Sequence, residues 1–109
     1  MLIEDCAREL ARVLESRYPV SVGEPVIEKN DQTSLATVTV EGVLCVDEVY
    51  VSVRVPREGR LHWTVEVGYR RKCQGSVDTH SFPRHVIARD LPSGFRLSFQ
   101  DVLKELEAP

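Results

Sequence analysis

The sequence predicts an α+β fold in two layers: an N-terminal helix, a four-stranded antiparallel β-meander, and C-terminal helices packed on one face of the sheet. Residues 49–69 contain two runs in which apolar and polar residues alternate strictly, with a turn sequence between them. Such alternation gives a strand one buried face and one wet face. Residues 2–18 and the residues after Leu97 instead repeat their apolar positions every three or four residues, which is typical of amphipathic helices.

The first helix is expected over residues 2–18, because Pro19 keeps the residue before it out of the helical region. The chain then becomes extended, but Gly23 and Pro25 interrupt it. A proline cannot donate to a central ladder, so the strand expected over residues 26–29 belongs at one margin of the sheet.

The next strand is expected over residues 34–46, where Gly42 marks either a bulge or a turn. A two-residue turn at Asp47 and Glu48 would pair Val46 with Val49. That register places Cys45 opposite Tyr50 and Val43 opposite Ser52, all on the outward face.

The two alternating runs, residues 49–55 and 61–69, form the central hairpin. A three-residue loop at 57–59 pairs Val53 with Trp63 and directs the tryptophan into the core. The opposite face then meets solvent and carries the polar residues of three strands, among them Thr39, Arg54 and Thr64.

Beyond Tyr69 the alternation stops, and residues 70–81 are polar and basic, which indicates an exposed loop. Pro83 suits the first position of a short helix that would run through Ala88. The last helix is expected to start at Ser98, which forms a capping-box pattern with Asp101.

Length and composition indicate a single domain spanning residues 1–109, of ordinary hydrophobic content and with a formal charge of −3. The charge is uneven: residues 1–55 hold five Lys/Arg and ten Asp/Glu, a net of −5, and residues 56–109 hold nine and seven, a net of +2. The three cysteines form no disulfide framework, which favours a reducing cytoplasm. No apolar run approaches the ~20 residues of a membrane span.

Cys73 is the candidate for chemistry. Together with His80 and His85 it lacks the short-spaced ligand pairs of a zinc site, so we expect no metal and no cofactor. The preceding cations at 70–72 favour its thiolate, but the sequence assigns it no base, and we expect no catalytic residue. A cysteine-dependent activity at Cys73 stays open.

Two candidate partner-binding surfaces follow from the expected fold. The first is the basic loop, in which Arg70, Arg71 and Lys72 project from a strand end and Arg84 joins them if the chain folds back. The second is the outward patch of Val43, Cys45 and Tyr50, an aromatic ring beside small apolar side chains.

The leading hypothesis is a small, non-enzymatic interaction or regulatory module that binds a protein partner, because the charge asymmetry suits electrostatic docking. One alternative is a nucleic-acid-binding domain that uses residues 70–72. Another is an acidic-surface inhibitor of a nucleic-acid-handling protein, of viral or mobile-element type, carried by Glu24, Glu28, Asp31, Glu41, Asp47 and Glu48. A homodimer through the outer sheet face or an edge strand is a further expectation.

Overall fold

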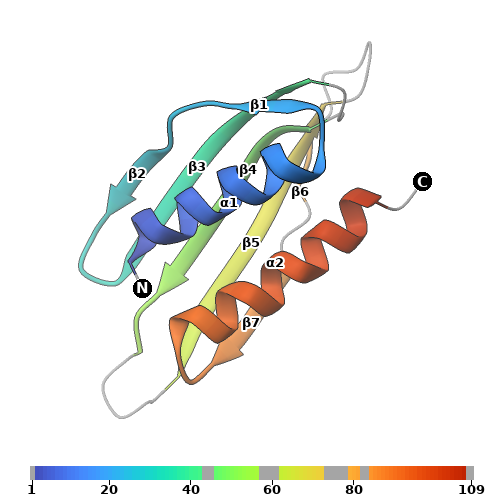
Figure 1. The fold of residues 1–109 in the computed structure, drawn as a ribbon. Helices are drawn as coiled ribbons and strands as arrows, with labels where there is room; N and C mark the ends of the chain where they lie inside the picture. The colour runs from blue at the N-terminus through green and yellow to red at the C-terminus, as the bar shows by residue number, and fades with distance from the viewer. Residues whose placement is uncertain (1, 43–45, 57–61, 73–78, 82–83, 108–109) are drawn as a thin grey trace.

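The computed structural model describes residues 2–42, 46–56, 62–72, 79–81 and 84–107, with residues 71, 72, 79–81, 84, 85 and 107 described by their backbone. Figure 1 shows two helices in front of one antiparallel sheet. The elements are, in chain order, α1 (Ile3–Arg17), β1 (Val20–Val22), β2 (Val26–Lys29), β3 (Thr33–Gly42), β4 (Val46–Arg54), β5 (Trp63–Lys72), β6 (Thr79–Ser81), β7 (Arg84–Ala88) and α2 (Leu91–Glu107).

The sheet of the described residues is five strands wide, because each of its edges consists of two short strands. β1 and β2 both pair with β3, and β6 and β7 both pair with β5, while β4 lies in the centre. Gly23 and Pro25 stand between the two strands of the first edge, as the sequence predicted for a marginal strand. The predicted α+β class and antiparallel sheet are therefore confirmed, and the predicted number of four strands is wrong.

The core lies between the sheet and the two helices. α1 packs over β1, β3 and β4, and α2 packs over β5 and β7, so both helices cover the same face (Figure 1). The valines on that face are fully buried across three strands: Val38 pairs with Val49, and Val51 pairs with Val67. The strict alternation of the sequence is what places these residues on one face.

α1 confirms the predicted N-terminal helix. Its first turn is closed by the carboxylate of Asp5, which accepts a hydrogen bond from the Leu2 N–H at 2.8 Å. The helix ends at Arg17, since Tyr18 before Pro19 is extended. An ion pair between Glu4 and Lys29 ties the helix to β2.

α2 begins at Leu91, seven residues before the predicted start at Ser98. Asp90 caps it, because its Oδ1 accepts a hydrogen bond from the Ser93 N–H at 2.8 Å. Ser98 lies inside the helix and is fully buried, and its Oγ accepts the Val67 N–H at 2.9 Å. The capping-box pattern at Ser98 was misleading because this serine serves a buried backbone donor instead.

α2 approaches the sheet closely at Gly94. A Cβ atom at this position would lie 2.8 Å from Val65 Cγ2 and 3.1 Å from Ala88 Cβ. Gly94 and Ser98 are one turn apart and small, so this side of α2 can rest on β5 and β7.

The predicted turn at Asp47 and Glu48 is wrong, because both residues lie inside β4. β3 ends at Gly42, whose φ of 148° is a backbone conformation that other residues rarely adopt. The ladder then pairs Tyr50 with Thr37 and Ser52 with Leu35, not with Cys45 and Val43 as predicted. Asp-Glu lacks the glycine or asparagine that a two-residue turn prefers, and both residues continue the strand instead.

The central hairpin is offset by two residues from the predicted register. Val53 pairs with Val65 instead of Trp63, which means that the connection is longer than a three-residue loop. An offset of two preserves the facing of every side chain. Trp63 consequently points toward the core, but it pairs with Ala88 near the end of the sheet and is half-buried instead of buried.

Both predictions for the segment after Tyr69 need correction. β5 continues through Lys72, so Arg70, Arg71 and Lys72 lie in a strand and not in a loop. The predicted short helix is strand β7, which pairs with β5 over all of its five residues. Val86 and Ile87 are β-branched and favour a strand, and β5 offers an unpaired edge to bind it.

Candidate functional site

In the part of the chain that the structure describes, both helices lie on one face of the sheet and no element covers the opposite face, which we call the outer face. Its residues come from three neighbouring strands at alternate positions, and the sequence correctly assigned Thr39, Arg54 and Thr64 to it. The outer face of the three central strands consists of Thr33, Leu35, Thr37, Thr39, Glu48, Tyr50, Ser52, Arg54, Thr64, Glu66, Gly68 and Arg70.

Tyr50 lies at the centre of the outer face and is half-buried. Its neighbour across the ladder is Gly68, and a Cβ atom there would lie 2.5 Å from Tyr50 Cζ and 2.5 Å from its hydroxyl oxygen. The ring therefore fills the space above the glycine. Its hydroxyl donates a hydrogen bond to Glu66 Oε2 at 3.3 Å, so the ring is held on the sheet at both ends.

Arg70 forms an ion pair across the same ladder. Its Nη1 lies 3.4 Å from Glu48 Oε2, and the two side chains are 53% and 30% exposed. An exposed pair of this kind contributes little to stability. It does change the electrostatics of the surface, because the cation that was predicted to project from a loop lies beside a carboxylate instead.

A shallow depression of about 270 Å³ adjoins this centre. Hydroxyl groups, one guanidinium and one carboxylate line it, contributed by Thr33, Ser52, Arg54, Thr64 and Glu66. Arg54 is exposed, and among the described residues no carboxylate lies within ion-pair distance of it. The depression therefore offers hydrogen-bond donors and acceptors at the level of the sheet.

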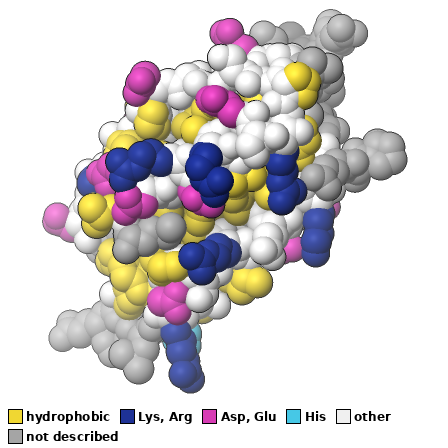
Figure 2. All heavy atoms as spheres, viewed as in Figure 1, with side chains coloured by type: hydrophobic (Ala, Val, Ile, Leu, Met, Phe, Trp, Pro, Cys, Tyr) yellow, Lys and Arg dark blue, Asp and Glu magenta, His cyan; other side chains and the backbone are white. Residues whose placement is uncertain are grey.

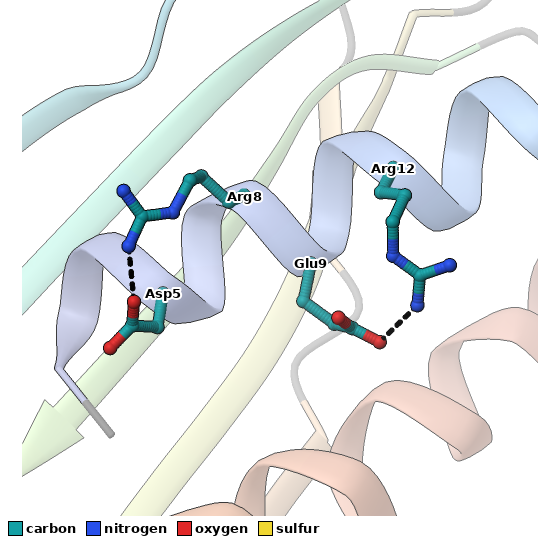
Figure 3. Close-up of a pocket in the computed structure, with 4 residues that line it drawn as sticks. All are labelled: Asp5, Arg8, Glu9 and Arg12. Atoms are coloured by element: carbon teal, nitrogen blue, oxygen red, sulfur yellow. Dashed lines mark hydrogen bonds and ion pairs between the residues drawn. The ribbon is translucent and has the colours of Figure 1, made fainter.

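The opposite side of the molecule, with the helices, has a different character. Figure 2 shows basic and acidic side chains interspersed there, with hydrophobic side chains visible between them. A hollow of about 260 Å³ on α1 is lined by Asp5, Arg8, Glu9 and Arg12. Figure 3 shows that these residues are already paired, Arg8 with Asp5 and Arg12 with Glu9 at 2.7 Å. This hollow is a solvated helix surface whose charges neutralise one another.

The residues of the predicted basic patch lie on two strands, Arg70, Arg71 and Lys72 on β5 and Arg84 on β7, and the structure describes the last three of them by their backbone. In the ladder, Arg71 stands opposite Val46 and His80, and Lys72 stands opposite Thr79. Arg84 stands opposite Val67, three positions before Arg70 along β5.

Of the second predicted patch, the structure describes Tyr50. Val43 and Cys45 lie outside the described residues, and the register that placed them beside the tyrosine is not the observed one. The neighbours that the register gives Tyr50 are Thr37 and Gly68. The alternation of apolar and polar residues predicted which residues belong to the outer face. Because the turn was wrongly predicted at Asp47 and Glu48, it did not predict which of these residues are neighbours.

The acidic residues considered for an inhibitor surface are dispersed. Glu28 and Asp31 are exposed near the start of β3, and Glu41 is exposed near its end. Since a strand rises about 3.3 Å per residue, the two groups are roughly 20 Å apart. Asp47 and Glu48 are half-buried, and Glu48 pairs with Arg70.

Cys6 is the cysteine that the structure describes, and it is fully buried on α1. Burial raises the pKa of its thiol to about 11, and the neighbouring Asp5 carboxylate adds to the shift. Cys73, the predicted reactive cysteine, lies outside the described residues. Within the ranges that the structure describes, no three His, Cys, Asp or Glu side chains cluster as metal ligands would.

Comparison of the chain with protein families, with curated proteins and with solved structures found no match. None of the helices in the described ranges is long and apolar enough to cross a membrane.

Proposed function

We propose that the protein is a small, non-enzymatic interaction module that binds a protein partner through the outer face of its sheet. The observation that carries the proposal is that α1 and α2 both cover one face, so that no described element covers the other face of the central strands, which has Tyr50 at its centre. Tyrosine is favoured at protein interfaces because its ring supplies apolar contact and its hydroxyl supplies a hydrogen bond.

The surroundings of Tyr50 suit a protein surface. Short hydroxyl side chains at Thr37, Ser52 and Thr64 leave the face flat and offer hydrogen bonds without the entropy cost of ordering long side chains. The charges that flank this centre are of both signs, with Arg54 and Arg70 beside Glu48 and Glu66. Mixed charges favour a partner with a complementary pattern over a uniformly charged one.

Nucleic acid is the less favoured partner on this reasoning. A sheet that binds single-stranded nucleic acid usually stacks bases on freely exposed rings and lines the path of the phosphates with cations. The ring of Tyr50 is packed on Gly68, and the carboxylates of Glu48 and Glu66 lie beside it on the same face. Those carboxylates would repel phosphate groups.

The proposal is tested with two matched variants. Ser52→Arg adds a large cation to the middle of the outer face, and Gln100→Arg adds the same cation to the exposed surface of α2. A partner captured from the native cell with the wild-type protein is purified and titrated calorimetrically against all three forms. We expect Ser52→Arg to weaken binding about tenfold or more and Gln100→Arg to leave it within about twofold, because changes at the centre of an interface dominate its energy.

Equal affinities for the wild type and Ser52→Arg would overturn the proposed surface, as would an equal loss in both variants. A fluorescent single-stranded oligonucleotide is titrated in parallel at low and high salt. Salt-sensitive binding of the oligonucleotide that changes in Ser52→Arg but not in Gln100→Arg would replace the proposal with the nucleic-acid alternative.

A further inference from the structure

The two edges of the sheet are protected to different degrees. An edge strand presents unpaired N–H and C=O groups that can pair with another chain, and proteins commonly block such edges with proline, charge or interruptions. The edge formed by β1 and β2 has all three: Pro25 precedes β2, Gly23 interrupts the edge, and Lys29 is ion-paired with Glu4 of α1.

The edge that contains β7 also has a proline, Pro83, just before the strand, but β7 is with five residues the longest of the four edge strands. The strand from Arg84 to Ala88 contains no proline, glycine or acidic residue. Ile87 is 69% exposed, the highest exposure among the large hydrophobic side chains of the described residues. Because Ile87 pairs with Thr64, it belongs to the outer face, while Val86 pairs with the buried Val65 on the helix side.

The hydrogen-bond pattern of the described strands shows which backbone groups of β7 point away from β5. In an antiparallel ladder the N–H and C=O groups of successive residues point alternately to the two neighbouring strands. The Val55 N–H donates to the Gln32 carbonyl at 3.1 Å, so odd-numbered positions of β4 bond toward β3 and even-numbered ones toward β5.

The same alternation can be extended from β4 through β5 to β7, and it then gives the direction of each backbone group of β7. The even-numbered positions of β5 bond to β4, so Val65 bonds toward β7 and its ladder partner Val86 bonds back to it. The positions on either side of Val86 therefore direct their N–H and C=O groups away from the sheet. These positions are His85 and Ile87.

We propose that β7 is a homodimer interface, at which β7 of one molecule pairs antiparallel with β7 of a second copy around a twofold axis at Val86. In this register position 85 stands opposite position 87 of the second copy, and each outward N–H meets an outward C=O. The contact is isologous, as in most dimers, and it is closed by symmetry so that no fibre can grow from it. Arg84 stands opposite Ala88, so no like charges face each other.

The position of α2 is compatible with the same twofold axis. α2 lies over β5 and β7, and Gly94 marks the side of α2 that rests on Ala88. Since a helix turns about 100° per residue, Leu97 lies about 60° from Gly94, on the side away from the core. Leu97 is 54% exposed. Strands pair about 4.8 Å apart, so the two copies of α2 would lie about one helix diameter apart with Leu97 between them.

This inference is independent of the proposed partner-binding function, because the outer face stays uncovered in the dimer. It joins two copies of the sheet edge to edge and so places two outer faces side by side. Failure of the edge contact would leave the test with Ser52→Arg unaffected.

Analytical ultracentrifugation of matched edge variants tests the proposal. Ile87→Lys and Val26→Lys introduce the same charge at exposed outer-face positions of the two opposite edges, where the wild-type side chains are 69% and 61% exposed. We expect a wild-type dimer, a dissociation constant raised about tenfold or more by Ile87→Lys, and no change with Val26→Lys. Circular dichroism confirms that both variants are folded.

A disulfide tests the register itself. Position 86 would face its own copy in a non-hydrogen-bonded pair, where Cα atoms are about 4.5 Å apart, a distance that a disulfide can span. Val86→Cys, combined with Cys45→Ser and Cys73→Ser, should form a covalent dimer on mild oxidation. A monomeric wild type, a dimer insensitive to Ile87→Lys, or equal weakening by Val26→Lys would overturn the proposal.

Discussion

The ring of Tyr50 lies on Gly68 so closely that a Cβ atom at position 68 would stand 2.5 Å from Tyr50 Cζ. Gly68 therefore leaves room on β5 for the ring of Tyr50, which belongs to the neighbouring strand β4. Aromatic residues commonly cover a glycine across a strand pair in this way. The contact gives the centre of the outer face a fixed shape, which the proposed binding function requires.

This contact predicts that Gly68→Ala lowers the free energy of unfolding of the wild type but raises it in a protein that lacks the ring of Tyr50. In the wild type the new methyl group displaces the tyrosine ring, and we expect a loss of about 1–2 kcal/mol in the free energy of unfolding. In the Tyr50→Ala background the methyl group meets no ring, and replacing a strand glycine should stabilise by about 0.5–1 kcal/mol. Urea denaturation of the four proteins gives the coupling energy. Equal effects in both backgrounds would show that the ring does not rest on Gly68.

Ser98 and Val67 yield a second prediction. Ser98→Ala should cost about 1–3 kcal/mol, because it leaves the Val67 N–H without the acceptor that it has at 2.9 Å in a buried position. Gln100→Ala, on the exposed side of the same helix, is the control and should stay within about 0.5 kcal/mol. Hydrogen exchange measured by NMR should show faster exchange at the Val67 amide in Ser98→Ala. Unchanged protection at that amide would mean that it has another acceptor.

The alternation of residues predicted the buried and exposed faces of the sheet correctly, because the facing of a side chain depends on local parity alone. The registers depended on where the chain turns, and no local rule revealed that the strand after Gly42 begins again at Val46. The register was wrong by eight residues between β3 and β4, where Tyr50 pairs with Thr37 instead of Cys45, and by two residues between β4 and β5. Both errors are even, so every facing was kept but the neighbours of Tyr50 were exchanged.

The same reasoning explains why the surface was predicted better than the site. Thr39, Arg54 and Thr64 were assigned to the outer face by parity, whereas the contact of Tyr50 with Gly68 depends on the true register. The end of the chain failed for another reason. Pro83 before residues 84–88 is a sequence signal for the start of a helix, but pairing of residues 84–88 with the edge of β5 outweighs that local preference.

Stability should fall as the solution becomes acidic, and the Glu4–Lys29 contact should contribute to that fall. A hydrogen bond from Lys29 holds the pKa of Glu4 below its ordinary value of 4.5. A depressed pKa means that the contribution is present above the ordinary value and is lost as the pH falls through the folded-state pKa. Glu4→Gln should therefore make the melting temperature depend less steeply on pH below 4.5.

The control for this series is Glu15→Gln, which removes a carboxylate from an exposed position near the other end of α1. The pKa values of Asp5 and Asp90 are also depressed, in each case chiefly by a backbone N–H donor, from Leu2 and from Ser93. Both remain in Glu4→Gln, so some acid sensitivity persists. Identical slopes for Glu4→Gln and the wild type would show that the link between α1 and β2 does not contribute to acid stability.

Thiol labelling measures how firmly α1 is docked on the sheet. Cys6 is fully buried, and its burial raises the pKa of the thiol to about 11, so the thiolate that reacts with alkylating reagents is scarce at neutral pH. We expect iodoacetamide to modify Cys6 only at the rate at which α1 opens. We expect Cys73 to react fastest of the three cysteines, because its neighbours in the sequence are cationic. Peptide mass spectrometry over a time course separates the three sites. Raising the pH toward 9 should accelerate Cys6 less than an unfolded control peptide, because the opening of α1 and not thiolate formation limits its rate. Labelling of Cys6 as fast as of that peptide would mean that the helix is not packed against β3 and β4.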